Sequence, residues 1–255
     1  MAATCWCEKP DYKLKPSIID IWLCQAESVK NRADYFNSLL SAEERARAER
    51  FKFAQHRERF IISHGFKRSV LANYLNIEPT HIHYKKGEKG KPSLLVDESE
   101  KPTLTFNLSH TEDVTLLAVA RGQEVGVDIE YRGRKTDWLS IGQRFFTKAE
   151  QQALFSLSQA QQKAAFFQLW TRKEAYMKVL GSGLSLAPTT FTLTVSPQPP
   201  ALIEHHSTTL PASMPVKFAD IDLPDALAEY SATLAVERSF EAYRCYQYSR
   251  AESLK

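Results

Sequence analysis

Cysteine is scarce in this sequence: its 255 residues include four, at Cys5, Cys7, Cys24 and Cys245. Their spacing fits neither a dense disulfide scaffold nor a zinc site, since no His/Cys pair near Cys5 and Cys7 completes a ligand set. Long apolar runs are also missing, which excludes a membrane-spanning helix of about 18 or more residues. The first ten residues lack the basic and apolar segments of a secretory signal. We therefore expect a cytoplasmic protein in a reducing compartment, with no membrane partner.

Neither sign of charge is in strong excess. The formal net charge is +3 and the isoelectric point is about 8.6. There is no dense basic stripe and no nucleic-acid-binding module, so we expect no nucleic-acid partner. The mild basicity permits an acidic protein partner without requiring one. The two standard nucleotide loops, GxxxxGK[ST] and GxGxxG, are absent, which argues against the usual nucleotide-binding folds.

Helix and strand signals alternate along the chain and predict an α+β fold. A Ser-Ala-Glu-Glu capping box at Ser41 opens a helical segment that runs to about residue 75, with a break near residues 54–56. Thr147 begins a second helix with Glu150 at the capping-box position. The other expected elements are a helix over residues 139–145, a long helix over 161–180 that stops at Gly181, strands over 104–108, 114–120, 125–130 and 191–195, a loop over 196–215, and a closing hairpin of 230–236 with 243–248.

Two parts of the sequence resemble each other. Residues 114–130 and 230–248 both read as strand, turn and strand, and each half of the chain places helices before strands. The pattern suggests a duplicated α+β unit. We expect an N-terminal half over residues 1–122 and a C-terminal half over 123–255. Each would be a small antiparallel sheet with packed helices, with the active site at their interface.

The strongest chemical signal is the pentapeptide Gly-Val-Asp-Ile-Glu at residues 126–130. Alternate residues of a strand share a face, so Asp128 and Glu130 present two carboxylates together. Adjacent like charges are unfavourable unless a cation neutralises them, and Mg²⁺ prefers oxygen ligands. The motif is equally compatible with an exposed strand end that carries two unrelated acids.

A second signal lies on the expected long helix. A spacing of four residues places Trp170, Glu174 and Lys178 in one row. An acid followed one turn later by a base is also the commonest surface ion pair, and this alternative stays open. If Glu174 is a third oxygen ligand of the same ion, Lys178 lies where it can neutralise a phosphate.

Taken in order, five segments make the sequence resemble the 4'-phosphopantetheinyl transferases, of the larger, single-chain Sfp type. The resemblance covers about residues 41–194 and implies two similar α+β halves related by a pseudo-twofold, with coenzyme A bound between them. The segments that carry it are Gly-Lys-Pro at residues 90–92, Phe-Asn-Leu-Ser-His at 106–110, Gly-Val-Asp-Ile-Glu at 126–130, Arg-Phe-Phe-Thr-Lys-Ala-Glu at 144–150, and residues 170–186.

The resemblance also implies a role for individual residues. Asp128, Glu130 and Glu174 would bind Mg²⁺, and Glu174, Lys178 and Asp128 would be catalytic. The residues expected to bind coenzyme A are Arg47, Arg59, Lys86, Lys89, Gly90, Lys91, Pro92, Asn107, Ser109, His110 and Lys178. Taken alone, the basic loop at residues 85–92 could equally be a solvated turn, the strand end at 106–111 a set of polar loop residues, and the two arginines exposed.

The implied reaction is the attack of a carrier-protein serine on the β-phosphorus of coenzyme A, with release of 3',5'-adenosine bisphosphate. Glu174 or a metal-bound water is the expected base; Glu150 is a weaker candidate because capping explains it. An acidic acyl or peptidyl carrier, the expected partner of a monomeric enzyme, would dock near Arg132, Arg134, Lys135, Arg144 and Lys148. Three alternatives stay open: an inactive coenzyme A-binding protein, an unrelated Mg-dependent phosphotransferase, and a nonenzymatic interaction protein.

Overall fold

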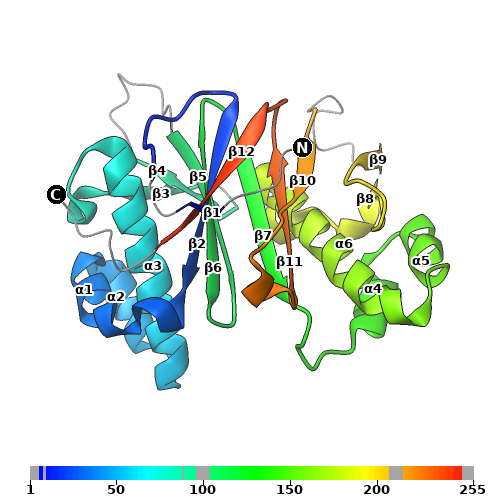
Figure 1. Ribbon diagram of the computed structural model, residues 1–255, viewed down its shortest axis with the longest axis horizontal. Helices are drawn as coiled ribbons and strands as arrows, with labels where there is room; N and C mark the ends of the chain where they lie inside the picture. Colours follow the sequence, from blue (N-terminus) through cyan, green and yellow to red (C-terminus); the bar gives the residue numbers. More distant parts are fainter. Residues whose placement is uncertain (1–5, 8–9, 88, 96–103, 207–214, 249–255) are drawn as a thin grey trace. The chain divides into compact units, whose positions relative to one another are not determined.

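The computed structural model describes residues 6–7, 10–87, 89–95, 104–206 and 215–248. The chain forms two compact units (Figure 1). The first takes in Met1–Lys85, Pro92–Gly122 and Ala242–Lys255, and the second takes in Lys86–Lys91 and Gln123–Glu241. These units differ from the expected halves, 1–122 and 123–255, at two places. The basic loop at residues 86–91 belongs to the second unit, and the last strand belongs to the first.

The described part of the first unit contains a five-stranded sheet in the order β1-β12-β2-β6-β5. Strands β2, β6 and β5 pair antiparallel, with β5 at the edge, whereas β12 lies parallel to β2, with Cys245 beside Ile21. The strands are β1 (Trp6–Cys7), β2 (Ile18–Gln25), β5 (Leu104–Thr111), β6 (Val114–Arg121) and β12 (Ala242–Gln247), and a separate pair is formed by β3 (Tyr84–Lys86) and β4 (Pro92–Leu94).

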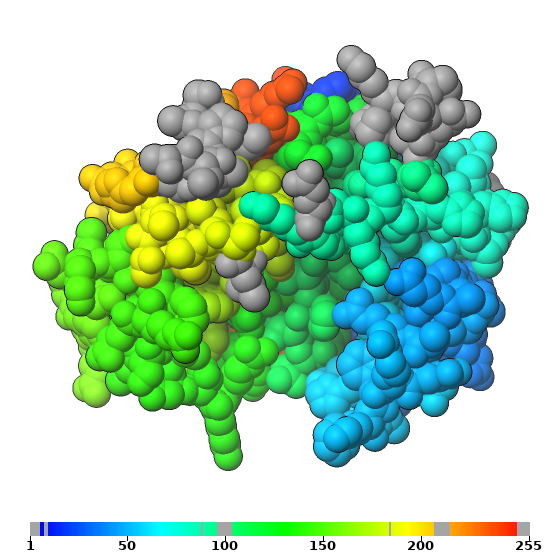
Figure 2. Space-filling view, turned by 180° about the vertical axis from the view of Figure 1, so that it is seen from behind, coloured from blue at the N-terminus to red at the C-terminus, as the bar shows by residue number. Residues whose placement is uncertain are grey.

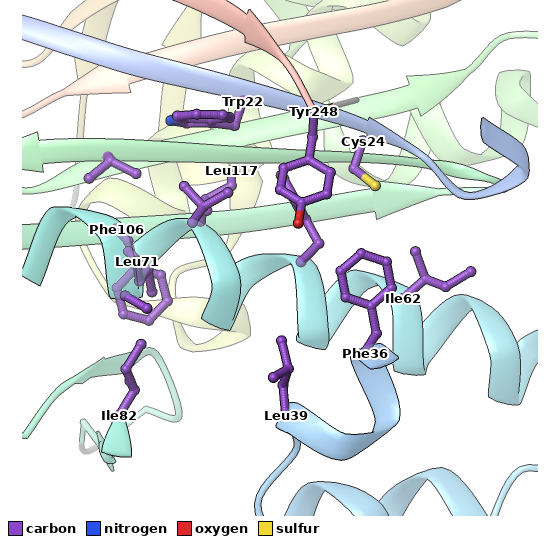
Figure 3. Packing of buried hydrophobic residues seen from close by; sticks show 14 of the residues in the cluster. Trp22, Cys24, Phe36, Leu39, Ile62, Leu71, Ile82, Phe106, Leu117 and Tyr248 are labelled. Carbon is purple, nitrogen blue, oxygen red and sulfur yellow. The ribbon is translucent and has the colours of Figure 1, made fainter. Parts of the chain in front are cut away.

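Helices α1 (Ala33–Leu39), α2 (Ala42–Glu49) and α3 (Ala54–Leu75) belong to this unit. The predicted capping box at Ser41 is confirmed, with Glu44 as its partner. In the close view of Figure 3, α3 lies between the sheet and α1, and Phe36, Leu71 and Trp22 point into one apolar core. The blue atoms of α2 lie at the surface of the unit in Figure 2.

The second unit is built on a three-stranded antiparallel sheet in the order β10-β11-β7. The long helix α6 packs against β7 and β11, and its apolar residues form the core of the unit with those of α4, α5 and β8. The elements are β7 (Val125–Tyr131), α4 (Trp138–Phe145), α5 (Lys148–Phe155), α6 (Gln159–Val179), β8 (Phe191–Leu193), β9 (Leu202–His205), β10 (Lys217–Asp220) and β11 (Tyr230–Val236). The 3₁₀ helices of this unit are η3 (Gly183–Ser185), η4 (Pro188–Thr190) and η5 (Asp225–Leu227); those of the first unit are η1 (Ala26–Arg32) and η2 (Pro79–His81).

The predicted α+β class is confirmed, and so are the capping box at Thr147 and the helix stop at Gly181, whose φ is +62°. The expected closing hairpin is wrong. β11 pairs with β7 and β10, whereas β12 pairs with β2 and β1, so the two strands lie in different sheets. The expected loop over 196–215 contains the strand β9, and its residues 207–214 lie outside the described part.

Among the described residues, no helix combines the length and apolarity that a membrane crossing requires. Cys7 is exposed, and Cys24 and Cys245 are buried; Cys5 lies outside the described part.

A cluster of buried charged side chains joins α2 to α3 in the first unit. Glu44 Oε1 accepts a hydrogen bond from Lys67 (3.1 Å) and lies 3.0 Å from His64 Nδ1, and Glu44 Oε2 accepts from Arg68 (2.6 Å). The imidazole of His64 stacks on Phe60 with a centroid distance of 3.9 Å. Burial lowers the pKa of His64 to about 4, and the positive charge of Lys67 acts in the same direction, against the opposing effect of Glu44.

This pKa predicts acid sensitivity of the fold. Between about pH 6.5 and 4 the histidine is protonated in the unfolded chain but stays neutral in the folded protein. Acid therefore lowers the free energy of unfolding by up to about 3 kcal/mol. We expect the free energy of unfolding, measured with urea, to fall over this window and to fall less in His64→Gln. The exposed His56→Gln is the matched control and should retain the parental slope. Equal slopes in all three proteins would contradict the prediction.

Candidate active site

The strand β7 places Asp128 and Glu130 on the face that α6 covers. Gly126 identifies this face, because a Cβ there would collide with the backbone oxygen of Ala175 and lie 2.6 Å from the backbone nitrogen of Val179. By alternation, Asp128 and Glu130 project from the same side of the strand. Asp128 is only 5% exposed. The close approach of strand and helix therefore brings the predicted carboxylates next to α6.

On α6, Glu174 and Lys178 are one turn apart. The ammonium group of Lys178 donates to Asp128 Oδ1 at 2.7 Å and to the carbonyl oxygen of Val127 at 3.0 Å. Lys178 therefore connects α6 to β7, and its charge also acts on Glu174.

The electrostatics show that the three predicted carboxylates interact. Burial, together with the negative charges of Asp128 and Glu130, raises the pKa of Glu174 to about 7, against the opposing effect of Lys178. Glu130 also has the guanidinium of Arg134 at 3.4 Å. Three carboxylates around one lysine leave an excess of negative charge on this part of the second unit.

Within the described ranges, no three His, Cys, Asp or Glu side chains are already arranged as a metal-binding group. The residues nevertheless fit Mg²⁺ by their chemistry. They supply hard oxygen donors, and a divalent cation relieves the repulsion by Asp128 and Glu130 that adds to burial in raising the pKa of Glu174. Asp128, Glu130 and Glu174 are therefore the residues that would hold the ion.

The basic loop of the second unit is anchored to the start of β7. Lys91 donates to Glu124 at 2.6 Å and to the carbonyl oxygen of Val125 at 3.1 Å. Gly90 has a φ of +88°, which favours glycine at this turn. Lys86 and Lys89 are exposed on the same loop. Glu124, which the sequence did not single out, is thus the main partner of Lys91.

The other predicted coenzyme A ligands lie in the first unit and stay predictions. Asn107 and Ser109 are buried on β5, and the adjacent His110 is exposed. Pro92 begins β4 and is exposed. The guanidinium of Arg47 lies 5.2 Å from the ring centre of Phe60.

Arg59 is held by acidic side chains of its own unit. It donates to both carboxylate oxygens of Asp113, at 2.7 and 3.1 Å, and lies 3.1 Å from Glu112. These contacts make the local charge negative, which opposes anion binding unless they rearrange.

Glu150 does not have the exposure of a general base. Its side chain is fully buried, it completes the capping box of α5 with Thr147, and it forms an ion pair with Lys173 at 2.8 Å. The capping interpretation is confirmed. The role of Lys173 was missed, because its neighbours Glu174 and Lys178 carry the recognisable spacing and nothing local indicates a buried partner.

The predicted carrier-docking residues lie on or near α4 and α5, whose green atoms form part of the second unit's surface in Figure 2. Arg144 and Lys148 are exposed, Arg132 donates to the carbonyl oxygen of Ala228, and Lys135 is exposed. Their role in docking stays a prediction.

Two protein-family models match this chain. A model described as the 4'-phosphopantetheinyl transferase superfamily matches residues 124–235, and one described as 4'-phosphopantetheinyl transferase, N-terminal, matches 27–122. Among solved structures, a Bacillus anthracis holo-(acyl-carrier-protein) synthase in complex with CoA (3',5'-ADP) covers 44% of this chain and 93% of its own, with 20% identity and a TM-score of 0.36.

Curated relatives cover more of the chain. The 4'-phosphopantetheinyl transferase HetI of Nostoc is 36% identical over 181 residues, which are 71% of this chain and 76% of the relative. Psf-1 of Bacillus pumilus is 32% identical over 67% of this chain and 70% of its own length, and Sfp of Bacillus subtilis is 31% identical over 62% and 67%. The chain therefore belongs to the 4'-phosphopantetheinyl transferase superfamily.

Proposed function

We propose that this protein transfers the 4'-phosphopantetheine arm of coenzyme A to a serine of an acyl or peptidyl carrier protein. The observation that carries the proposal is the group of Asp128, Glu130, Glu174 and Lys178 on β7 and α6. It lies within the region that matches the superfamily model.

The proposed metal is Mg²⁺, held by Asp128, Glu130 and Glu174. When bound, it supplies positive charge next to the pyrophosphate of coenzyme A. Lys178 contributes a second positive charge. Because its ammonium already lies 2.7 Å from Asp128, it is held close to the carboxylates and can contact a phosphate oxygen there.

In the proposed reaction, the serine oxygen forms a bond to the β-phosphorus of coenzyme A. The bond from that phosphorus to the bridging oxygen breaks, and 3',5'-adenosine bisphosphate leaves with the electron pair. The serine proton passes to the carboxylate of Glu174. Lys178 stabilises the negative charge that develops on the leaving phosphate.

The proposal extends to the partners and the compartment. An acidic carrier protein is expected to meet the basic residues Arg132, Arg144 and Lys148 of the second unit. We further propose that the enzyme acts as a monomer in the cytoplasm, where carrier proteins and coenzyme A are both available to it.

The decisive experiment is to incubate the protein with coenzyme A, Mg²⁺ and an apo carrier protein, and to weigh the carrier by mass spectrometry. We expect a gain equal to one phosphopantetheine arm, no gain when a chelator removes the metal, and no gain on a carrier whose acceptor serine is alanine. Binding of coenzyme A without any mass gain would instead support an inactive binding protein. Phosphate transfer from a nucleoside triphosphate would support the unrelated phosphotransferase.

A further inference from the structure

The residue before Glu174 is tied to the interior of the second unit. The Lys173 ammonium lies 2.8 Å from Glu150 Oε1 and donates to the carbonyl oxygens of Pro188 and Phe191, each at 2.8 Å. These three contacts use all the hydrogen-bond donors of the group. Lys173 is only 1% exposed, so water plays little part in holding it.

Glu150 connects this contact to two further elements. Its Oε1 accepts from the backbone N–H of Leu193 and its Oε2 from that of Thr147, each at 2.8 Å. The ion pair of Glu150 with Lys173 therefore joins the N-terminus of α5, the middle of α6 and the strand β8 at fixed distances.

Lys173 projects from a different side of α6 than Glu174 and Lys178 do. With 3.6 residues per turn, Lys173 projects about 100° from Glu174 and about 140° from Lys178 around the helix axis. A rotation of α6 about its axis would break the contacts of Lys173 and, in the same movement, carry Glu174 and Lys178 away from Asp128.

Stability alone does not account for this arrangement. A buried ion pair loses the hydration of both charges, and a well-packed apolar pair of similar size is often as stable or more stable. The charged pair instead fixes the orientation of α6, because its several short hydrogen bonds can all form at only one rotation of the helix about its axis.

We propose that Glu150 and Lys173 are positioning residues for the transfer reaction: the buried pair fixes the rotation of α6 and so holds Glu174 and Lys178 against Asp128. Neither residue touches substrate or metal in this assignment. The inference rests on the proposed function, because it assumes that Glu174 and Lys178 take part in transfer.

The test is the double variant Glu150→Gln, Lys173→Met, which leaves no uncompensated buried charge and keeps a residue suited to the capping box. We expect kcat for transfer to fall roughly 10- to 100-fold, as for other small misplacements of catalytic groups, with KM for the carrier unchanged. We also expect a change in metal binding, which can be measured without the transfer reaction. Binding of Mn²⁺ in the presence of 3',5'-adenosine bisphosphate, followed by electron paramagnetic resonance, should weaken about tenfold or more.

Leu154→Ala is the matched control, because Leu154 is buried on α5 but does not belong to the ion pair. It should lower the melting temperature while retaining the parental kcat and Mn²⁺ midpoint. If the double variant does not fold, Lys173→Arg takes its place: the longer, forked side chain keeps the charge but shifts α6, and should weaken Mn²⁺ binding in the same direction.

A folded variant with the parental kcat and Mn²⁺ midpoint would overturn the positioning role and leave the proposed function standing. A parental protein that transfers nothing to the carrier would overturn the proposed function instead.

Discussion

Transfer of the phosphopantetheine arm should fall by roughly 10²- to 10⁴-fold when Glu174 is replaced by Gln, as expected for loss of a general base. The same variant should fold at least as well as the parent. Glutamine removes a buried negative charge that Asp128 and Glu130 repel, and this repulsion contributes to the raised pKa of Glu174. Above about pH 7 the folded parent carries that charge and the variant does not. We therefore expect an equal or higher melting temperature together with the loss of activity.

Three further measurements sharpen this result. Asp128→Ala should lose transfer to a similar extent. The matched control is Glu204→Gln, an exposed acid on β9 of the same unit, which should keep parental activity. Calorimetric titration with Mg²⁺ should show weaker binding by both active-site variants. Near-normal transfer by Glu174→Gln and Asp128→Ala alike would contradict the metal and base assignment.

The second large effect is expected at Gly126. A methyl group at this position would collide with the backbone oxygen of Ala175 and would lie 2.6 Å from the backbone nitrogen of Val179 and 3.1 Å from Lys178 Cβ. The first two atoms are helix backbone, which cannot rotate away as a side chain can. Gly126→Ala should therefore push α6 from β7, destabilise the fold by about 1–3 kcal/mol or more, and abolish most transfer. Urea unfolding and the carrier-mass assay measure the two effects.

Gly142→Ala on α4 is the matched control for Gly126→Ala. The nearest atom to an added methyl group there is 3.5 Å away, which is ordinary contact, and alanine favours a helix over glycine by up to about 1 kcal/mol. This variant should be as stable as the parent or more so, with unchanged transfer. If Gly126→Ala resembled Gly142→Ala in both assays, the close approach of α6 and β7 would not be needed for the reaction.

Much of the local structure followed from the sequence, because short-range signals determine it. The capping boxes at Ser41 and Thr147 and the helix stop at Gly181 depend on backbone groups within a few residues, and all three are confirmed. The electrostatic effect of Asp128 and Glu130 on Glu174 agrees with the expectation that the three acids lie together, and their role as metal ligands stays a prediction. That expectation required the family resemblance as well as periodicity, since the helix and the strand are distant in sequence.

What the sequence did not predict depends on long-range pairing. The closing hairpin looked plausible because β11 and β12 are adjacent in sequence and both apolar, yet each finds its partner elsewhere, β7 for the first and β2 for the second. The same holds for buried charges. Nothing near Lys173 or Lys91 reveals that their partners are Glu150 and Glu124, because an ion pair between distant residues leaves no local pattern.

The position of β12 has a consequence for how the protein is made. This strand lies between β1 and β2 in the sheet, and more than two hundred residues separate it from β2 along the chain. During synthesis the ribosome must finish the second unit before it delivers the strand that completes the first. Until then, the helices and antiparallel strands of the first unit leave one edge of β2 unpaired. The pairing of β12 with β2 is slow to form, because the two strands are far apart in sequence.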